Sequence, residues 1–219
     1  MAAGAKQPTG RYGGRTAGER RAERRQRLLD AGLRLFGGGP GYRATSVSAL
    51  CEEAGLSTRQ FYEEFSNLEE VLAALHTLIN KWAEEAAMSA LATMPEGGVE
   101  ERAAAAFRAY ASCATCDPRR IRIAFVEVVG VSPQLEAQRL ARRGRWAEVM
   151  LHELKRAAVR GEAAERDYRV AATAFIGAVN GLLHDWTAGA IDASLDEIVD
   201  ELLLMLIGVL RPKGWRAAP

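Results

Sequence analysis

Ser57-Thr58-Arg59-Gln60 places four polar side chains in consecutive positions, at the start of a stretch that continues with Phe61. A guanidinium such as that of Arg59 can donate two hydrogen bonds to guanine O6 and N7, and a glutamine amide can pair similarly with adenine. Ser57 and Gln60 have the spacing of a capping box, so we expect a helix to begin here. The pattern predicts a helix whose polar end reads base edges in DNA, with a simple phosphate contact as the alternative for Arg59.

Two helical patterns precede this stretch and must position it. The first consists of apolar and small residues at helical spacing: Leu29, Gly32, Leu33 and Phe36. The second is built in the same way from Val47, Leu50, Cys51 and Ala54. The glycine-rich run 37–41, which contains Pro40, should stop the first helix, while Thr45 or Ser46 can cap the second and Gly55 break it.

The rest of the chain also has a helical pattern. A fourth helix is expected over 68–81 or beyond, with Ser66 and Glu69 at capping-box spacing. No strand-like alternation follows, and further helices are predicted at 99–114, 117–129, 133–160, 165–187 and 195–210. Proline after Asp117 and after Ser132 marks two of the starts. We therefore predict an all-α fold.

Charge is unevenly distributed although the chain carries only +1. Residues 1–27 hold eight basic and two acidic side chains, so this stretch carries +6 and the remainder −5. A basic arm on a mildly acidic body suggests a local contact with a polyanion, and a solvated, disordered leader is the alternative. The longest wholly apolar run, 202–210, is too short for the roughly 20 residues of a membrane helix, and we expect a cytoplasmic protein.

Cys113 and Cys116 have the two-residue spacing of redox and metal motifs, in a chain with an odd third cysteine. The three histidines are isolated, so no metal site is predicted. Structural packing is the favoured interpretation of the pair, with a thiol-based sensor as the alternative. No catalytic arrangement stands out, so we expect neither enzymatic activity nor a fixed cofactor.

The N-terminal motifs resemble the DNA-binding domain of TetR-family transcriptional regulators. They are RRQRLLDA at 24–31, LF at 35–36, GYRATSV at 41–47, AGLS at 54–57 and FYEEF at 61–65. The resemblance implies a homodimer that binds double-stranded DNA at a palindromic operator, usually as a repressor, and releases it when a small molecule binds. It divides the chain into a flexible basic arm at 1–18, a helix-turn-helix domain at 19–66 and a helical ligand-binding and dimerisation domain at 67–219.

Carried over to this sequence, the resemblance assigns DNA contacts to the reading helix, to the start of the second helix and to the first helix. The expected residues are Arg24, Arg25, Thr45, Ser46, Ser48, Ser57, Thr58, Arg59, Gln60 and Tyr62. Three features depart from the family pattern. Leu68 stands where the family commonly has a phosphate-contacting lysine, the run 37–41 is about one residue longer than usual, so that the first helix is expected to end early, and Glu63 and Glu64 place acid near the DNA face.

The C-terminal helices carry aromatic residues with a few polar groups among them, as small-molecule sites do. The candidate pocket residues are Phe107, Tyr110, Phe125, Glu127, Trp146, Met150, Phe175, Asn180 and His184. The last two helices have apolar faces that could form a four-helix dimer interface, with an intramolecular core as the alternative. The candidate interface residues are Phe175, Val179, Leu182, Trp186, Leu195, Ile198, Leu202 and Leu206.

The sequence leaves two other functions open. One is a thiol-based redox protein that uses Cys113 and Cys116. The other is a helical partner-binding scaffold with a degenerate helix-turn-helix. Leu68, in place of the lysine, and the acidic Glu63 and Glu64 support this alternative.

Overall fold

The computed structural model describes residues 16–210, and every regular element within them is helical, which confirms the all-α prediction. Most of the predicted basic arm lies outside the described residues. The N-terminal module contains α1 (Ala17–Gly32), its π-helical continuation η1 (Leu33–Gly38), η2 (Tyr42–Ala44), α2 (Val47–Ala54) and α3 (Thr58–Tyr62). The longer part contains α4 (Leu68–Thr93), α5 (Val99–Thr115), α6 (Pro118–Arg122), η3 (Ile123–Glu127), α7 (Pro133–Val159), α8 (Arg169–Thr187) and α9 (Leu195–Leu210).

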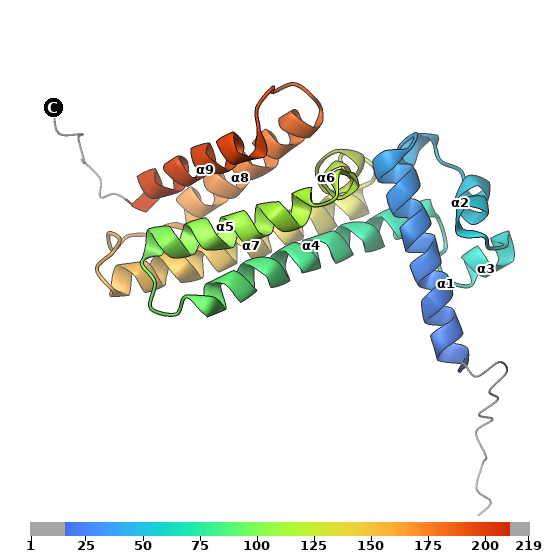
Figure 1. The fold of residues 1–219 in the computed structure, drawn as a ribbon, viewed down its shortest axis with the longest axis horizontal. Coiled ribbons are helices and arrows are strands. Elements are labelled where there is room, and N and C mark those ends of the chain that lie inside the picture. Colours follow the sequence, from blue (N-terminus) through green and yellow to red (C-terminus); the bar gives the residue numbers. More distant parts are fainter. Residues whose placement is uncertain (1–15, 211–219) are drawn as a thin grey trace, which may run out of the picture.

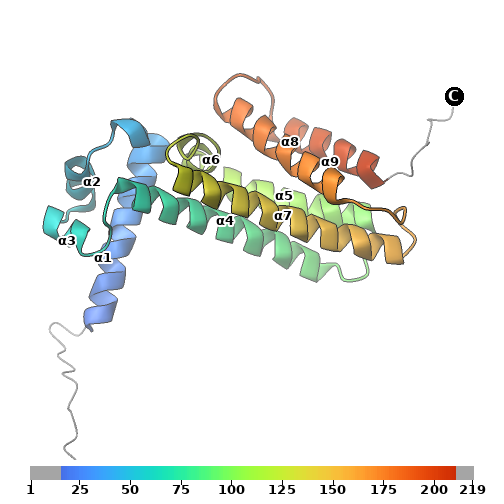
Figure 2. The same cartoon turned by 180° about the vertical axis from the view of Figure 1, so that it is seen from behind.

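The long helices form two layers beside the N-terminal module. Helices α4, α5 and α7 run side by side, and α8 and α9 cover them on one side (Figures 1 and 2). Helix α4 begins within the module and extends along α5, so one continuous helix joins the two parts (Figure 1). None of the helices in residues 16–210 has an apolar stretch long enough to cross a bilayer.

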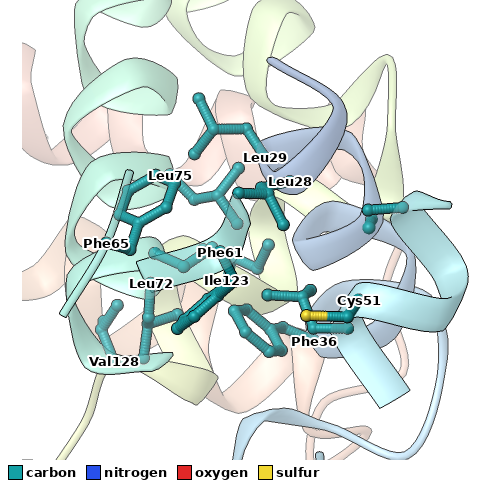
Figure 3. Close-up of a cluster of buried hydrophobic side chains, with 14 of the residues drawn as sticks. Leu28, Leu29, Phe36, Cys51, Phe61, Phe65, Leu72, Leu75, Ile123 and Val128 are labelled. Atoms are coloured by element: carbon teal, nitrogen blue, oxygen red, sulfur yellow. The ribbon is translucent and has the colours of Figure 1, made fainter. Parts of the chain in front are cut away.

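One hydrophobic core spans both parts of the molecule. Leu28, Phe36 and Phe61 of the module are fully buried, and they pack in one cluster with Leu72 of α4 and Ile123 of η3 (Figure 3). Burying a large apolar side chain contributes about 1.5–3 kcal/mol. The module is therefore held to the longer part by packing as well as by the continuity of α4, and the domain boundary at 66–67 is crossed by this core.

The turn between α2 and α3 requires glycine. Gly55 has φ +61°, the left-handed conformation in which a Cβ is unfavourable. A Cβ there would also lie 2.7 Å from the guanidinium of Arg27, which donates hydrogen bonds to the carbonyls of Ala54 and Gly55. Arg27 thus ties the turn back to α1 and fixes where α3 begins.

The first helix is longer at both ends than the sequence suggested. It begins at Ala17, because Thr16 and Glu19 form a complete capping box. It also continues through Gly37 and Gly38 instead of ending early at the glycine run. A Cβ on Gly37 would lie 2.5 Å from the carbonyl oxygen of Arg119, so this glycine allows the backbone of α6 to approach η1 closely.

The cap of α4 was predicted one residue too early. Asn67, not Ser66, is the N-cap, and its side chain accepts a hydrogen bond from the Glu70 amide at 2.9 Å. The Glu70 carboxylate accepts at 2.8 Å from the amide of Ser66, the residue before the cap, and not from that of Asn67, so the arrangement is not a complete capping box. The caps predicted at Asp117, Ser132 and Ser194 are confirmed.

Candidate DNA-binding surface and ligand cavity

Helix α3 presents polar side chains to solvent on a fixed base. Ser57 and Gln60 form the predicted capping box, with the Gln60 amide N–H donating to Ser57 Oγ at 3.2 Å. Gln60 Oε1 accepts from the Ser57 amide at 2.9 Å, which leaves the NH₂ group of Gln60 available for other partners. Thr58 and Arg59 are exposed, and Phe61 beneath them is fully buried.

Tyr62 also lies on the outer side of α3. Its ring is 58% exposed and packs edge-on against Phe61, with 5.1 Å between ring centroids. A large aromatic side chain left in solvent beside a buried one is unusual for packing alone. Its position beside Arg59 suits a phenol hydroxyl that bonds a phosphate.

Glu63 and Glu64, the two acidic residues that depart from the family pattern, have different roles. The Glu64 side chain is 0% exposed, and its carboxylate accepts hydrogen bonds from Arg21 at 3.1 Å and Arg24 at 2.9 Å. Its backbone carbonyl accepts a further bond from Arg25 at 3.1 Å. Glu64 therefore leaves no free charge at the DNA face, because its charge is neutralised inside the module, where it joins α1 to the end of α3.

Glu63 does remain at the surface, where it forms looser ion pairs with Arg59 at 3.4 Å and Arg24 at 3.6 Å. Arg25 is also engaged, because its guanidinium lies over the Phe65 ring, 4.1 Å from the centroid. Arg24 and Arg25 thus have structural partners that the sequence did not reveal, and their contact with DNA stays a prediction.

The start of α2 contributes a second exposed edge. Ser46 caps the helix by accepting from the Ala49 amide at 3.1 Å, and Ser48, two residues further on, is exposed. Thr45, by contrast, is buried and donates its hydroxyl to the Gly41 carbonyl at 2.7 Å. The Thr45 hydroxyl is therefore engaged within the module, and contact of Thr45 with DNA stays a prediction.

A cavity of about 130 Å³ lies between the long helices. Six of the nine predicted pocket residues line it: Phe107, Tyr110, Trp146, Met150, Phe175 and Asn180. Phe125 lines a smaller neighbouring cavity. The pattern of aromatic residues at helical spacing was a correct guide to the place, because α5, α7 and α8 turn these faces toward one another.

Glu127 and His184 do not line the larger cavity, and their placement there was wrong. Glu127 accepts hydrogen bonds from Arg122 at 2.8 Å and from the Tyr42 amide at 2.8 Å, so it fastens η3 to the N-terminal module. His184 bonds the Phe125 carbonyl through Nδ1 at 2.6 Å and serves the contact between α8 and η3.

Arg102, the main polar group of the larger cavity, was not among the predicted pocket residues. Arg102 is 4% exposed, and its guanidinium donates to Glu153 at 2.7 and 3.0 Å and to the Leu91 carbonyl at 2.9 Å. It also bonds the Met94 carbonyl. The only available signal was an arginine on the otherwise alanine-rich inner face of α5, which cannot reveal a partner some fifty residues away.

The predicted dimer residues are largely interior to the single chain. Five of them pack in the core between α8, α9 and their neighbours: Phe175, Val179, Ile198, Leu202 and Leu206. Leu182, Trp186 and Leu195 are half-buried. For the five buried residues, the structure agrees with the alternative of an intramolecular core. The exposed face instead carries Val170 at 83%, Leu204 at 63%, Met205, and small residues such as Ala174 and Gly181.

Cys113 and Cys116 are free thiols at the end of α5. Burial raises the pKa of the Cys113 thiol, which reduces its thiolate fraction at neutral pH. Cys116 is exposed and lies 3.3 Å from a guanidinium nitrogen of Arg120. In residues 16–210 no three His, Cys, Asp or Glu side chains come together as metal ligands. Sensing by the pair stays a prediction.

The described residues form an all-helical structure with the exposed polar end of α3 in the N-terminal module and a cavity among the long helices. This defines the class: a helix-turn-helix module joined to a larger helical domain. Residues 28–75 match the family model described as bacterial regulatory proteins, tetR family. The match covers the helix-turn-helix module and the start of α4, and it identifies that part of the chain as a TetR-family DNA-binding domain.

Solved structures with the same fold cover nearly the whole chain at low identity. The fatty acid degradation regulator FadR from Bacillus halodurans matches with a TM-score of 0.72 and 19% identity, over 86% of this chain and 96% of its own. FadR from Bacillus subtilis in complex with stearoyl-CoA has a TM-score of 0.71 and 17% identity, over 85% of this chain and 99% of its own. AibR in complex with isovaleryl coenzyme A and operator DNA has a TM-score of 0.64 and 21% identity, over 83% of this chain and 97% of its own. A search of curated protein sequences finds no match.

Proposed function

We propose that this chain is a ligand-responsive transcriptional repressor that binds a palindromic operator as a homodimer. The observation that carries the proposal is the exposed polar end of α3, whose base is locked by buried Phe61 and by the Glu64 contacts to α1. A helix held in this way can enter the major groove without losing its orientation.

Within this proposal, Arg59 and Gln60 read base edges, while Thr58 supports them. Ser46, Ser48 and Tyr62 contact phosphates on either side of the groove, where the start of α2 adds a partial positive charge. Ser57 acts mainly by capping α3, because its hydroxyl is used within the helix. Arg24 and Arg25 contribute positive potential beside the phosphates in addition to their structural bonds.

The homodimer rests on the outer face of α8 and α9. Val170, Leu204 and Met205 expose apolar surface there, and Ala174 and Gly181 offer the small side chains that let a second helix approach closely. Leu204→Glu should give a monomer in light scattering, whereas Val159→Glu, at an exposed apolar site elsewhere, should leave the mass unchanged. A monomeric wild-type protein would contradict this part of the proposal.

The effector is a small molecule bound in the helical cavity, and an acyl-CoA is the first class to test, because two structures of the same fold contain one. The cavity belongs to α4, α5, α7, α8 and α9, and α4 continues into the DNA-binding module. A ligand releases DNA only if it binds better to a conformation in which the two reading helices no longer match half-sites about 34–36 Å apart.

The decisive experiment is a gel shift with DNA from beside the protein's own coding region, compared with shuffled DNA of the same composition. We expect retardation of the first DNA only, and its reversal by an effector. Indifference to both duplexes at low ionic strength, where phosphate contacts are strongest, would reject the proposal and favour the scaffold alternative.

A further inference from the structure

Two cavities of different character share one wall. The larger, of about 130 Å³, and the smaller, of about 30 Å³, are both lined by Tyr110, Trp146 and Asn180. The Tyr110 and Trp146 rings meet edge-on, with 5.0 Å between centroids. Asn180 donates its NH₂ group to the Ile176 carbonyl at 2.8 Å, which leaves its oxygen as an acceptor at the wall. The two spaces are therefore adjacent, with these three side chains between them.

The larger cavity is apolar, and the charges it contains are already neutralised. Arg102 and Glu153 are bonded to each other, and the remaining Arg102 donors point at backbone carbonyls, so this pair needs no ion from a ligand. Its volume is close to that of an engineered apolar cavity of about 150 Å³ that binds benzene. The space thus suits a compact apolar group of about six carbons and not a long acyl chain.

The smaller cavity is cationic. Three arginines of α7 line it, and no acidic residue does. Arg139 is occupied by Glu136, with two bonds of 2.8 Å, and Arg142 has only a distant ion pair with Glu84 at 4.0 Å. Arg143, half-buried, makes no hydrogen bond or ion pair with any of residues 16–210.

The electrostatics of neighbouring groups agree with this geometry. His76 of α4 lines the same cavity, and its pKa is lowered to about 4 by burial and then by the charges of Arg142 and Arg139. Gln138, on α7, donates to His76 Nδ1 at 3.1 Å, as suits a neutral ring. The nearby acid Glu136 has its pKa lowered chiefly by its hydrogen bonds with Arg139 and in small part by Arg143. An anion entering the cavity would find a guanidinium without a bonded partner.

We propose that the effector is a compact amphipathic anion: its apolar group of about six carbons fills the larger cavity, and its anionic group bonds Arg143 beside the Tyr110–Asn180 wall. This rests on the proposed function, and it specifies which ligands of that site are accepted. A carboxylate directly attached to the apolar group supplies this chemistry. The phosphates of a coenzyme A thioester do not, because the pantetheine arm separates them from the acyl group and the smaller cavity, of about 30 Å³, has no room for that arm.

Calorimetry on the full-length protein tests the proposal with four probes: isovalerate, isovaleryl-CoA, stearoyl-CoA and coenzyme A alone. We expect isovalerate to bind at least tenfold more tightly than isovaleryl-CoA, stearoyl-CoA or coenzyme A. Arg143→Gln should weaken that binding about ten- to hundredfold, the usual effect of losing a charge-assisted bond. The matched control is Arg145→Gln on the same helix, since Arg145 bonds Glu84 and lines neither cavity.

A second variant tests the apolar part. Ala106 lines the larger cavity, and Ala106→Phe should fill it and abolish binding, with thermal unfolding confirming that the variant is folded. Binding of isovalerate that Arg143→Gln weakens supports the proposal. Equal binding by wild type and Arg143→Gln, equal or tighter binding of any of the three coenzyme A probes, or no binding of any probe would overturn it.

Gel shifts with the same samples separate this inference from the proposed function. A protein that binds its DNA and ignores every probe contradicts the inference alone. A protein that binds a probe and ignores DNA contradicts the proposed function.

Discussion

The N-terminal module buries a glutamate between two arginines, whereas the longer part buries an arginine against a half-buried glutamate, and each leaves a different arginine available. In the module, Glu64 takes up Arg21 and Arg24, while Arg59 stays 90% exposed on a five-residue helix. In the longer part, Glu153 takes up Arg102, while Arg143 stays half-buried and unbonded among residues 16–210, in the middle of the 27-residue α7. Water and salt screen the charge at the first site strongly, and they screen the half-buried charge at the second site less.

The comparison shows that the type of residue does not decide its role; the nearest acid and the depth of burial do. Arginines beside a buried carboxylate hold the fold, because removing either partner leaves an uncompensated charge. An arginine without such a partner is available for recognition.

The largest expected effect follows from breaking the buried group in the module. Glu64→Gln removes the charge that Arg21 and Arg24 share, and it should lower the free energy of unfolding by about 3–5 kcal/mol. Glu63→Gln, which changes only exposed ion pairs one residue away, should cost less than about 1 kcal/mol. Urea denaturation of both variants measures the difference, and similar losses would show that Glu64 is no more important than a surface charge.

The next largest expected effect is a pH dependence of the free energy of unfolding, caused by His76 beside the cationic cavity. Its pKa is lowered from 6.5 to about 4 by burial, so the unfolded chain takes up a proton in a pH range where the folded chain does not. Stability is therefore complete above pH 6.5 and falls as pH drops toward 4, by up to roughly 3 kcal/mol. Denaturation at stepwise pH should show this slope in wild type and a flatter one in His76→Asn; identical slopes would assign the pH dependence to other groups.

The exposed arginine of the module should affect sequence discrimination and not stability. Arg59→Ala should cost about 1–3 kcal/mol per half-site on the cognate operator, with little change on random DNA. Tyr62→Phe should weaken binding to both DNAs about equally, because phosphates carry no sequence information. Competition gel shifts give both ratios. Unchanged discrimination in Arg59→Ala would make that residue a phosphate contact.

The smallest effect concerns the joint between the two regions. Asn67→Ala should destabilise the protein by about 1 kcal/mol, because the side chain caps α4. Ser66→Ala, at the cap that the sequence pattern favoured, should change stability by less than half as much, since the structure uses only its backbone amide. Thermal unfolding of the two variants compares their stabilities, and a larger loss for Ser66→Ala would support Ser66 as the cap of α4.

Local patterns predicted the helices well and most of the cavity's aromatic lining. Capping boxes and helical spacing act within a few residues, so Ser57, Ser132 and Ser194 were readable from the sequence. What could not be predicted were pairings over long separations. Arg102 with Glu153, and Glu64 with the arginines of α1, depend on which helices meet, and one sequence does not encode that meeting in any local signal.

The dimer residues failed for a related reason. A wide apolar surface on α9 has two sides, and periodicity alone does not say which side faces its own chain. Phe175 and Leu202 were chosen as members of the apolar faces of α8 and α9, and both are buried within the single chain. The small residues of α8, such as Gly181, were the better indication of an open face.

The glycine at position 37 and the carboxylate of Glu127 act together as a rigid coupling. With no side chain between η1 and the backbone of α6, and with the Tyr42 amide bonded to η3 at 2.8 Å, there is no slack in which one part can shift alone. Phe125, only two residues from Glu127, lines the cationic cavity. A ligand that displaces Phe125 would therefore act close to the contacts that Glu127 and Gly37 make between the two parts.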